Sequence, residues 1–185
     1  MLILWIVISL AVAVAFWLAF WSLLNYLSGK SHWQAKFVAG TLPEPPPDGF
    51  YNGSAYLLGS RPVPWLGKSF ELANGRGFNI FTPQGASLLK IMTPLYRLFR
   101  KNADGNTDAY YFETSTGEGF KDKQIDTFKL DYNSPENPFL IGIILDEIVQ
   151  TAPNEYLGKV HMKVFPGYYA TIGFFGLRKE LSRQA

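Results

Sequence analysis

The chain has 185 residues, of which 48% are apolar and only 17% charged, and it contains no cysteine. Its 17 Lys and Arg residues and 15 Asp and Glu residues all lie outside residues 2–29. This composition excludes a wholly soluble enzyme, a transporter with several apolar spans, and any site built on thiolates. The net charge of +2 is too small to indicate nucleic-acid binding.

Residues 2–27, LILWIVISLAVAVAFWLAFWSLLNYL, predict one transmembrane helix. At 1.5 Å per residue this helix is about 39 Å long, which exceeds the ~30 Å hydrocarbon layer. A cleaved signal peptide has basic residues before its apolar core and a small-x-small cleavage site after it. Because neither feature is present, we expect residues 1–29 to form a retained anchor.

The basic residues that flank the anchor indicate its orientation. Lys30 and Lys36 follow the apolar run, whereas no Lys or Arg precedes it. Positive flanks favour the cytoplasmic side. The sequence therefore predicts a single-pass membrane protein with its main domain in the cytoplasm.

The predicted anchor has two unlike faces, because about 100° separates successive helical residues. One face is a narrow stripe of small residues: Ala11, Ala15, Ala19 and Ser22. The opposite face is aromatic: Phe16, Trp17, Phe20 and Trp21. Small residues at this spacing let a second membrane helix approach closely. Alternatively, the alanines reflect ordinary membrane-helix composition and the aromatic residues form an interfacial belt with Tyr26 and Trp33.

Residues 30–48 are expected to form a juxtamembrane segment and a linker. Residues 41–48 (TLPEPPPD) contain four prolines, which cannot continue a regular helix or sheet. The sequence predicts a short, stiff spacer that holds the following domain off the membrane.

From residue 49 onward the pattern is one of short strands separated by turns. Alternation of apolar and polar residues and enrichment in aromatic and β-branched residues mark eight strands. Their expected ranges are 50–58, 68–72, 77–81, 110–116, 127–132, 141–151, 156–165 and 168–177. Asp104-Gly105 is a hairpin-type turn signal before the fourth strand. The expected domain covers residues 49–180, followed by a tail at 181–185.

One segment, residues 86–99 (ASLLKIMTPLYRLF), has helical rather than strand spacing. Pro94 is expected to kink or split it. The basic residues around its polar side are Lys90, Arg97, Arg100 and Lys101. Such a segment either covers one end or side of the sheet or lies on an anionic membrane surface.

Together these elements predict a mainly β fold, an antiparallel barrel or strongly curved sheet with one helical insertion, behind one transmembrane helix. Several short segments resemble a lipocalin-like (calycin-type) barrel of an uncharacterised bacterial kind. They are DGFYNG (48–53), WLGKSF (65–70), GFN (77–79), LDYN (130–133), LDEI (145–148) and YLGK (156–159). The resemblance implies a fold but assigns no catalytic residue. The overall plan is similar to single-helix accessory subunits of bacterial photosynthetic and respiratory complexes, and this resemblance implies a bacterial inner membrane.

Candidate chemistry in the sequence is sparse. We expect His32 at the membrane interface and His161 on the polar face of a strand, both in contact with solvent. The DGNTD segment at 104–108 lacks the glycine and the bidentate acid of a calcium loop. Asp146 and Glu147 are adjacent in a predicted strand, so they point to opposite faces and cannot act as a carboxylate pair. One of them can point inward, where Arg76 or a lysine would pair with it. We expect no cofactor, no metal and no catalytic activity.

Aromatic residues are expected to supply much of the barrel interior: Tyr51, Tyr56, Phe70, Phe78, Tyr110, Phe112, Phe128, Tyr132, Phe174 and Phe175. Such a barrel is either filled by its own side chains or has room for one apolar ligand. The leading hypothesis is a non-catalytic accessory subunit that contacts other membrane subunits through its helix and barrel. The alternative is a membrane-tethered binder or carrier of a lipid or other apolar molecule.

Overall fold

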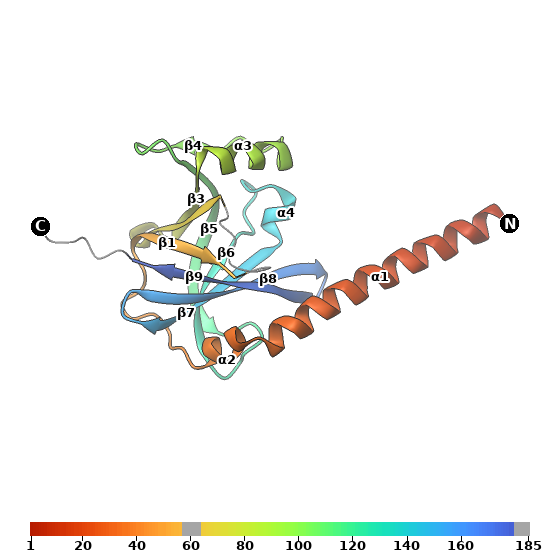
Figure 1. Cartoon of the computed structure of the whole chain (residues 1–185), viewed down its shortest axis with the longest axis horizontal. Coiled ribbons are helices and arrows are strands. Elements are labelled where there is room, and N and C mark those ends of the chain that lie inside the picture. Colours follow the sequence, from red (N-terminus) through yellow and green to blue (C-terminus); the bar gives the residue numbers. More distant parts are fainter. Residues whose placement is uncertain (57–63, 180–185) are drawn as a thin grey trace, which may run out of the picture.

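The computed structural model describes residues 1–56 and 64–179 and is mainly β (Figure 1). The helices are α1 (Leu2–Lys30), α2 (His32–Val38), α3 (Pro83–Met92) and α4 (Phe139–Gly142), with a 3-10 turn at Leu72–Asn74. The strands are β1 (Gly49–Ala55), β2 (Trp65–Glu71), β3 (Arg76–Phe81), β4 (Arg100–Lys101), β5 (Thr107–Glu118), β6 (Asp126–Asp131), β7 (Ile144–Ala152), β8 (Glu155–Phe165) and β9 (Tyr168–Arg178).

Eight of these strands form a closed antiparallel barrel. Each strand pairs with its neighbour along the chain, β3 pairs with β5, and the first strand, β1, pairs with the last, β9. The short β4 pairs with the first residues of β5, on the edge opposite β3. The two strands form a hairpin whose turn contains Asp104 and Gly105. Closure removes the unpaired strand edges that an open sheet would expose. The predicted eight-strand fold is confirmed, and its topology is compatible with a lipocalin-like barrel.

Aromatic rings fill most of the barrel interior. Seven of the ten expected residues belong to the main buried cluster: Tyr51, Phe70, Tyr110, Phe112, Phe128, Tyr132 and Phe175. The other three lie on the outer side. Tyr56 and Phe174 pack with α2, and Phe78 contacts Tyr111. Phe174 was predicted to point into the barrel, and this was wrong. Because β9 is covered on both faces, the apolar character of its residues does not show which face a ring occupies.

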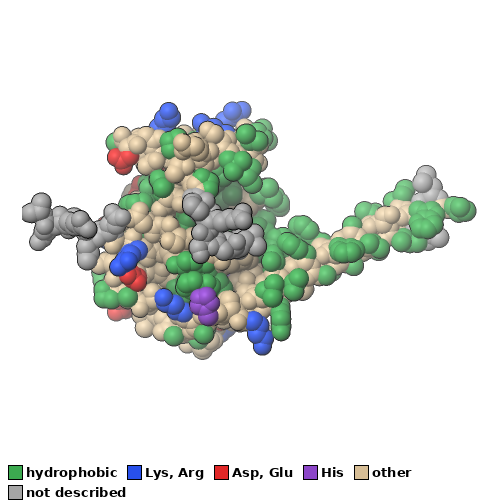
Figure 2. Space-filling view, in the orientation of Figure 1, with side chains coloured by type: hydrophobic (Ala, Val, Ile, Leu, Met, Phe, Trp, Pro, Cys, Tyr) green, Lys and Arg blue, Asp and Glu red, His purple; other side chains and the backbone are tan. Residues whose placement is uncertain are grey.

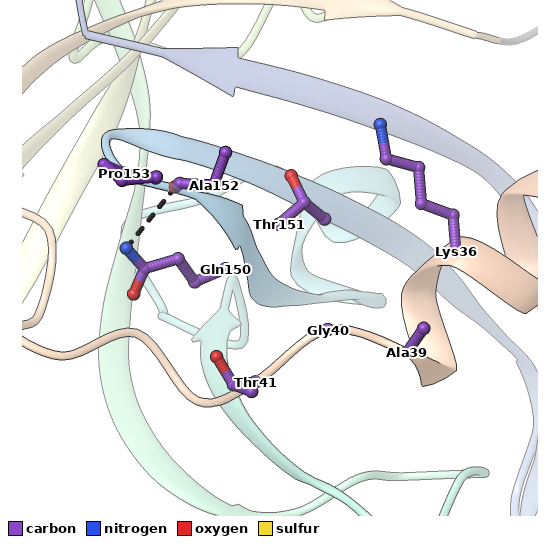
Figure 3. Close-up of a pocket in the computed structure, with 8 residues that line it drawn as sticks. All are labelled: Lys36, Ala39, Gly40, Thr41, Gln150, Thr151, Ala152 and Pro153. Atoms are coloured by element: carbon purple, nitrogen blue, oxygen red, sulfur yellow. Dashed lines mark hydrogen bonds between the residues drawn. The ribbon is translucent and has the colours of Figure 1, made fainter.

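The segment expected to be a spacer instead lies against the barrel. Phe37 of α2 is fully buried beside Phe174 of β9. The following chain pairs Thr41 with Gln150 of β7, and Pro43 and Pro47 are fully buried. Figure 3 shows Thr41 near Gln150, where the chain runs on from the end of α2 through Gly40. The proline-rich segment therefore lies along the barrel surface rather than separating α1 from the barrel.

The helical insertion is shorter than residues 86–99. The Thr82 side chain accepts a hydrogen bond from the Gly85 backbone N–H and caps α3 at its start. The helix ends at Met92, two residues before Pro94, as expected for a proline that breaks a helix. Beyond it the chain runs without regular structure to β4, and Tyr96 of this run is buried against the barrel core.

α1 is the one helix, among those described, that is long and apolar enough to cross a membrane. Side chains 5–20 are exposed, and Trp21 is the first buried one. Further along, Asn25 accepts a hydrogen bond of 3.2 Å from the Thr171 backbone N–H, and the Ser28 hydroxyl donates one of 3.2 Å to the Thr171 carbonyl. Trp21, Asn25 and Ser28 share one helix face. The last turns of α1 are thus bound to β9.

Candidate functional site

The structure leaves the predicted small-residue stripe of α1 free. Ala11, Ala15, Ala19 and Ser22 are all exposed. On the aromatic face, Phe16, Trp17 and Phe20 are more than half exposed, whereas Trp21 is 8% exposed. Trp21 therefore belongs to the contact with the barrel rather than to a lipid or partner face.

The four basic residues grouped by the sequence do not lie on one helix. Lys90 is on α3, Arg97 is in the irregular run after it, and Arg100 and Lys101 form β4. All four are exposed, and Arg100 lies over the Tyr111 ring. A single basic amphipathic helix is therefore absent from this part of the structure, because α3 stops before Pro94.

The most distinctive site is a buried polar network inside the barrel. Lys68 of β2 forms an ion pair of 2.9 Å with Asp146 of β7, and both side chains are about 95% buried. The Lys68 ammonium also donates to Asn79 Oδ1 at 3.0 Å and to the Tyr132 hydroxyl. Trp65 Nε1 donates to the same Asn79 oxygen at 3.0 Å. Three strands lie between β2 and β7 in the sheet, so this network crosses the barrel interior.

Strand alternation explains why these polar groups point inward. Lys68 is two residues from Phe70, and Asp146 is two residues from Ile148; both apolar neighbours are in the barrel core. Residues two apart in a strand share a face. The expectation that one acid of the 146–147 pair points inward and pairs with a lysine is confirmed. Arg76, the other expected partner, instead pairs with Glu71 at the surface.

The hydrogen bonds of this network are complete except at one atom. The Asn79 amide donates to the Tyr132 hydroxyl at 3.0 Å and to the Tyr110 carbonyl at 3.1 Å. Tyr132 donates to Asp146 Oδ2 at 3.3 Å. The other carboxylate oxygen, Oδ1, has no hydrogen-bond partner among the described residues. A carboxylate oxygen accepts hydrogen bonds only, so Oδ1 is suited to a donor.

Burial controls the protonation of the network. It lowers the pKa of Lys68 below its usual value, although the Asp146 carboxylate opposes this shift. Burial also raises the pKa of Tyr132 well above its usual value, and the Asp146 charge adds to that effect. Four rings surround the Lys68 ammonium at 4.9–5.5 Å and favour its charged form: Trp65, Phe112, Tyr132 and Phe175.

A cavity of about 280 Å³ lies over this network. Lys68, Asn79, Tyr132 and Asp146 form its polar side. The rest of its wall is apolar or aromatic: Trp65, Phe81, Tyr110, Ile141, Ile144, Val160 and Phe175. Its volume is near the lower end of the ~300–1,000 Å³ typical of ligand pockets. It therefore fits a small molecule or the end of a larger one.

A second buried polar group lies on the outer face of the barrel, beneath the end of α1. Glu147 accepts hydrogen bonds from His161 Nε2 at 2.9 Å, Thr127 Oγ1 at 2.9 Å and the Phe120 backbone N–H at 2.6 Å. His161 Nδ1 lies 3.2 Å from Thr171 Oγ1. The order Thr–His–Glu resembles a hydrolytic triad, but all three side chains are at most 2% exposed. Through Thr171 the group lies against the end of α1.

The expectation that His161 is solvated was wrong. Its position on the polar face of β8 was correct, but the segment after β5 and the end of α1 cover that face. Burial lowers the pKa of His161, although Glu147 opposes this effect. Burial raises the pKa of Glu147, but its hydrogen bonds with His161, Phe120 and Thr127 lower it further than burial raises it. Because a carboxylate oxygen only accepts hydrogen bonds, His161 Nε2 carries the hydrogen in its contact with Glu147.

A second pocket and the distribution of possible metal ligands among the described residues offer weaker candidates for a functional site. A pocket of about 390 Å³ between α2 and the end of β7 is lined by Lys36, Ala39–Thr41 and Gln150–Pro153, and Figure 3 shows no acidic side chain among them. Within the described ranges, no three His, Asp or Glu side chains gather into a metal-binding group. The network around Lys68 and Asp146 is the stronger candidate.

Comparisons of the chain with protein-family models, with curated proteins and with solved structures each give no match. The function must therefore be inferred from the geometry.

The interior ion pair can be tested with a double-mutant cycle. We expect Lys68→Met or Asp146→Leu alone to lower the free energy of unfolding by about 3–5 kcal/mol, because each leaves an unpaired buried charge. The double variant is expected to recover more than half of that loss. Denaturant unfolding in mild detergent, followed by tryptophan fluorescence, measures these values. The exposed Glu71–Arg76 pair is the control: Arg76→Met should cost less than about 1 kcal/mol. Equal, additive losses at both interior positions would contradict the pairing.

The outer group predicts a pH dependence. The folded pKa values of His161 and Glu147 both lie below their usual values, so the unfolded state binds more protons in acid. Stability should therefore decrease as the pH falls below about 6.5, and further below about 4.5. We expect His161→Gln to flatten the decrease between pH 7 and 5 in thermal unfolding experiments. His32→Gln, at an exposed position, should leave it unchanged. An unaltered slope in the His161 variant would show that another group causes it.

Proposed function

We propose that the protein is a membrane-anchored binding protein for a small apolar molecule that carries one hydrogen-bond donor, such as a hydroxyl group. The observation that supports this proposal most directly is the cavity over the Lys68–Asp146 network. Its apolar wall favours apolar ligands by burying their surface, at roughly 25 cal/mol per Å². We propose that its polar side orients the ligand: Asp146 Oδ1 has no hydrogen-bond partner among the described residues, and a ligand hydroxyl would have to reach this buried oxygen to donate to it.

The network favours binding over catalysis. The three N–H groups of the Lys68 ammonium have three acceptors: Asp146 Oδ2, Asn79 Oδ1 and the Tyr132 hydroxyl. An amine nucleophile needs a free lone pair, which this arrangement does not offer. Tyr132, whose pKa is raised by burial, is a poor acid at neutral pH. We therefore propose that the network positions a ligand and does not transform it.

The apolar anchor supports a membrane-associated role. α1 is long enough to cross a bilayer, and its side chains from Trp5 to Phe20, nearly all of them apolar, are exposed. The flanking Lys30 and Lys36 continue to favour a cytoplasmic barrel. A tethered barrel of this kind samples molecules dissolved in, or released from, the lipid phase.

Binding can be measured with 2-naphthol as the probe and 2-methoxynaphthalene, which lacks the donor, as its matched control. Full-length protein in phosphatidylcholine nanodiscs should bind 2-naphthol saturably, above the level of empty nanodiscs. One hydrogen bond is worth about 1–1.5 kcal/mol, so the control probe should bind about tenfold more weakly. Fluorescence titration measures both.

A pair of variants in α4 places the probe in the cavity. Ile141→Trp fills part of it and should weaken 2-naphthol binding at least tenfold. Leu140→Trp, at the adjacent residue that is 60% exposed, should change binding less than twofold. Absence of saturable binding, or equal effects of the two variants, would contradict the proposal.

A second candidate function is that of an accessory subunit in a larger membrane complex, such as a photosynthetic or respiratory one. The exposed stripe of α1 favours it, because the barrel contacts a different face of the helix, that of Trp21, Asn25 and Ser28. Small residues at four-residue spacing permit close helix packing.

This second candidate predicts that tagged protein extracted in mild detergent migrates well above its mass of 20.8 kDa, together with other membrane proteins. Ala15→Phe should abolish the association, whereas Ala13→Phe, about 160° away around the helix, should not. Migration as a lone chain would contradict an accessory role.

A further inference from the structure

The cavity opens toward one particular end of the barrel. In an antiparallel meander, alternate connections lie at opposite ends. The connection from β3 to β5 that contains α3, the connection from β6 to β7 that contains α4, and the β8–β9 turn therefore share one end. Cavity residues Trp65, Phe81 and Ile144 begin or end their strands at this same end. Figure 1 shows α4 and the β8–β9 turn on the side from which α1 extends, and α3 at the top of the molecule.

This end carries a rim of exposed apolar side chains. They come from α3 and the turn after it, from α4, and from the β8–β9 turn: Ile91, Met92, Leu95, Phe139, Leu140 and Phe165. Ile91, Leu95 and Phe139 are 77%, 85% and 79% exposed. Figure 2 shows green side chains gathered here, next to those of α1. Contiguous exposed apolar surface of this kind marks an interaction site in soluble domains.

The described turns at the opposite end of the barrel expose fewer large apolar side chains. The β7–β8 turn consists of Pro153 and Asn154, and the chain between β2 and β3 includes Asn74 and Gly75. Only Leu72 among the large apolar residues there is more than 40% exposed. The most exposed apolar side chains of the barrel domain therefore lie at the end that faces along α1.

The position of α1 indicates what covers the rim. Thr171, to which Asn25 and Ser28 bind, lies near the start of β9, close to the β8–β9 turn. The helix before Trp21, residues 2–20, is about 28 Å long, close to the ~30 Å hydrocarbon thickness. If that part spans the bilayer, the membrane surface lies beside Trp21, at the same end of the barrel as the rim.

We propose that the open end of the barrel rests in the interfacial layer of the bilayer that α1 spans, with the rim inserted among the lipids. The cavity then exchanges its ligand with the membrane rather than with water. An outer groove of about 910 Å³ lies between α4 and the β8–β9 turn, lined in part by Phe139, Ile143, Phe165 and Tyr169, and continues this surface. The inference rests on the membrane anchoring proposed above, but not on the identity of the ligand.

The absence of cysteine makes a site-specific test simple. Single-cysteine variants Leu95→Cys and Phe139→Cys report on the rim, Asn154→Cys on the opposite end, and Ala13→Cys on the anchor. Each full-length variant is labelled with a bimane fluorophore and placed in phosphatidylcholine vesicles, with and without phosphatidylglycerol. Nitroxide-bearing lipids quench labels in the bilayer, and iodide quenches labels in water.

We expect the lipid quencher to reduce fluorescence at least twofold at positions 95, 139 and 13, and iodide to quench only position 154. If positions 95 and 139 behave like 154 while 13 is quenched by lipid, the rim is in water and the inference is wrong although the anchor stands. If position 13 is also unquenched by lipid, the anchoring itself fails. Protection of the rim labels from both quenchers would indicate a second protein copy as the occupant and would overturn the inference.

Discussion

The attachment of the last turns of α1 to strand β9 determines how the rest of the molecule is presented. Asn25 and Ser28 bind both polar groups of the Thr171 backbone, and the Thr171 side chain lies against the buried His161–Glu147 pair. A helix joined to a barrel by a free linker could point in any direction. Here the direction is fixed, so the end of the barrel that carries α3, α4 and the β8–β9 turn faces along the helix (Figure 1).

The barrel uses adjacent residues of β7 for two separate purposes. Asp146 points inward to Lys68 and the cavity, and Glu147 points outward to His161 and the docked helix. Both pairs are buried. The inner one is an ion pair, and a buried ion pair seldom stabilises a fold better than apolar side chains of similar size. In the proposed function, the inner pair is retained because it gives an otherwise apolar cavity an oriented polar side. The outer pair holds the surface on which α1 rests.

Much of the fold was predictable from local patterns. Alternation in residues 127–132 and 156–165, together with the Asp104-Gly105 turn, marks strands that the structure contains. Pro94 correctly predicted the break after α3. These features depend on the period of side chains along a strand and on the fixed φ of proline, which are local properties.

The candidate site was predictable only in part. Phe70 was expected inside, and Lys68 shares its face, so an inward lysine was available from the same alternation. The pairing of this lysine with Asp146 was not predictable, because β2 and β7 face each other across the barrel interior and are far apart in the sequence. His161 and Trp21 were misjudged for a related reason: a strand or helix pattern shows which residues share a face, but not which distant segment covers it. The same limit applies to the 41–48 segment, whose prolines predict a stiff chain but not the surface that it lies on.

The central claim is that the barrel holds a small apolar molecule taken from the membrane. The most direct measurement is native mass spectrometry of the full-length chain released from its own membranes in gentle micelles. The account predicts one small, lipid-soluble adduct per chain, present in the unaltered protein and lost when the cavity is filled by Ile141→Trp. A spectrum that shows only the bare 20.8 kDa chain, or an adduct unaffected by filling the cavity, would contradict it.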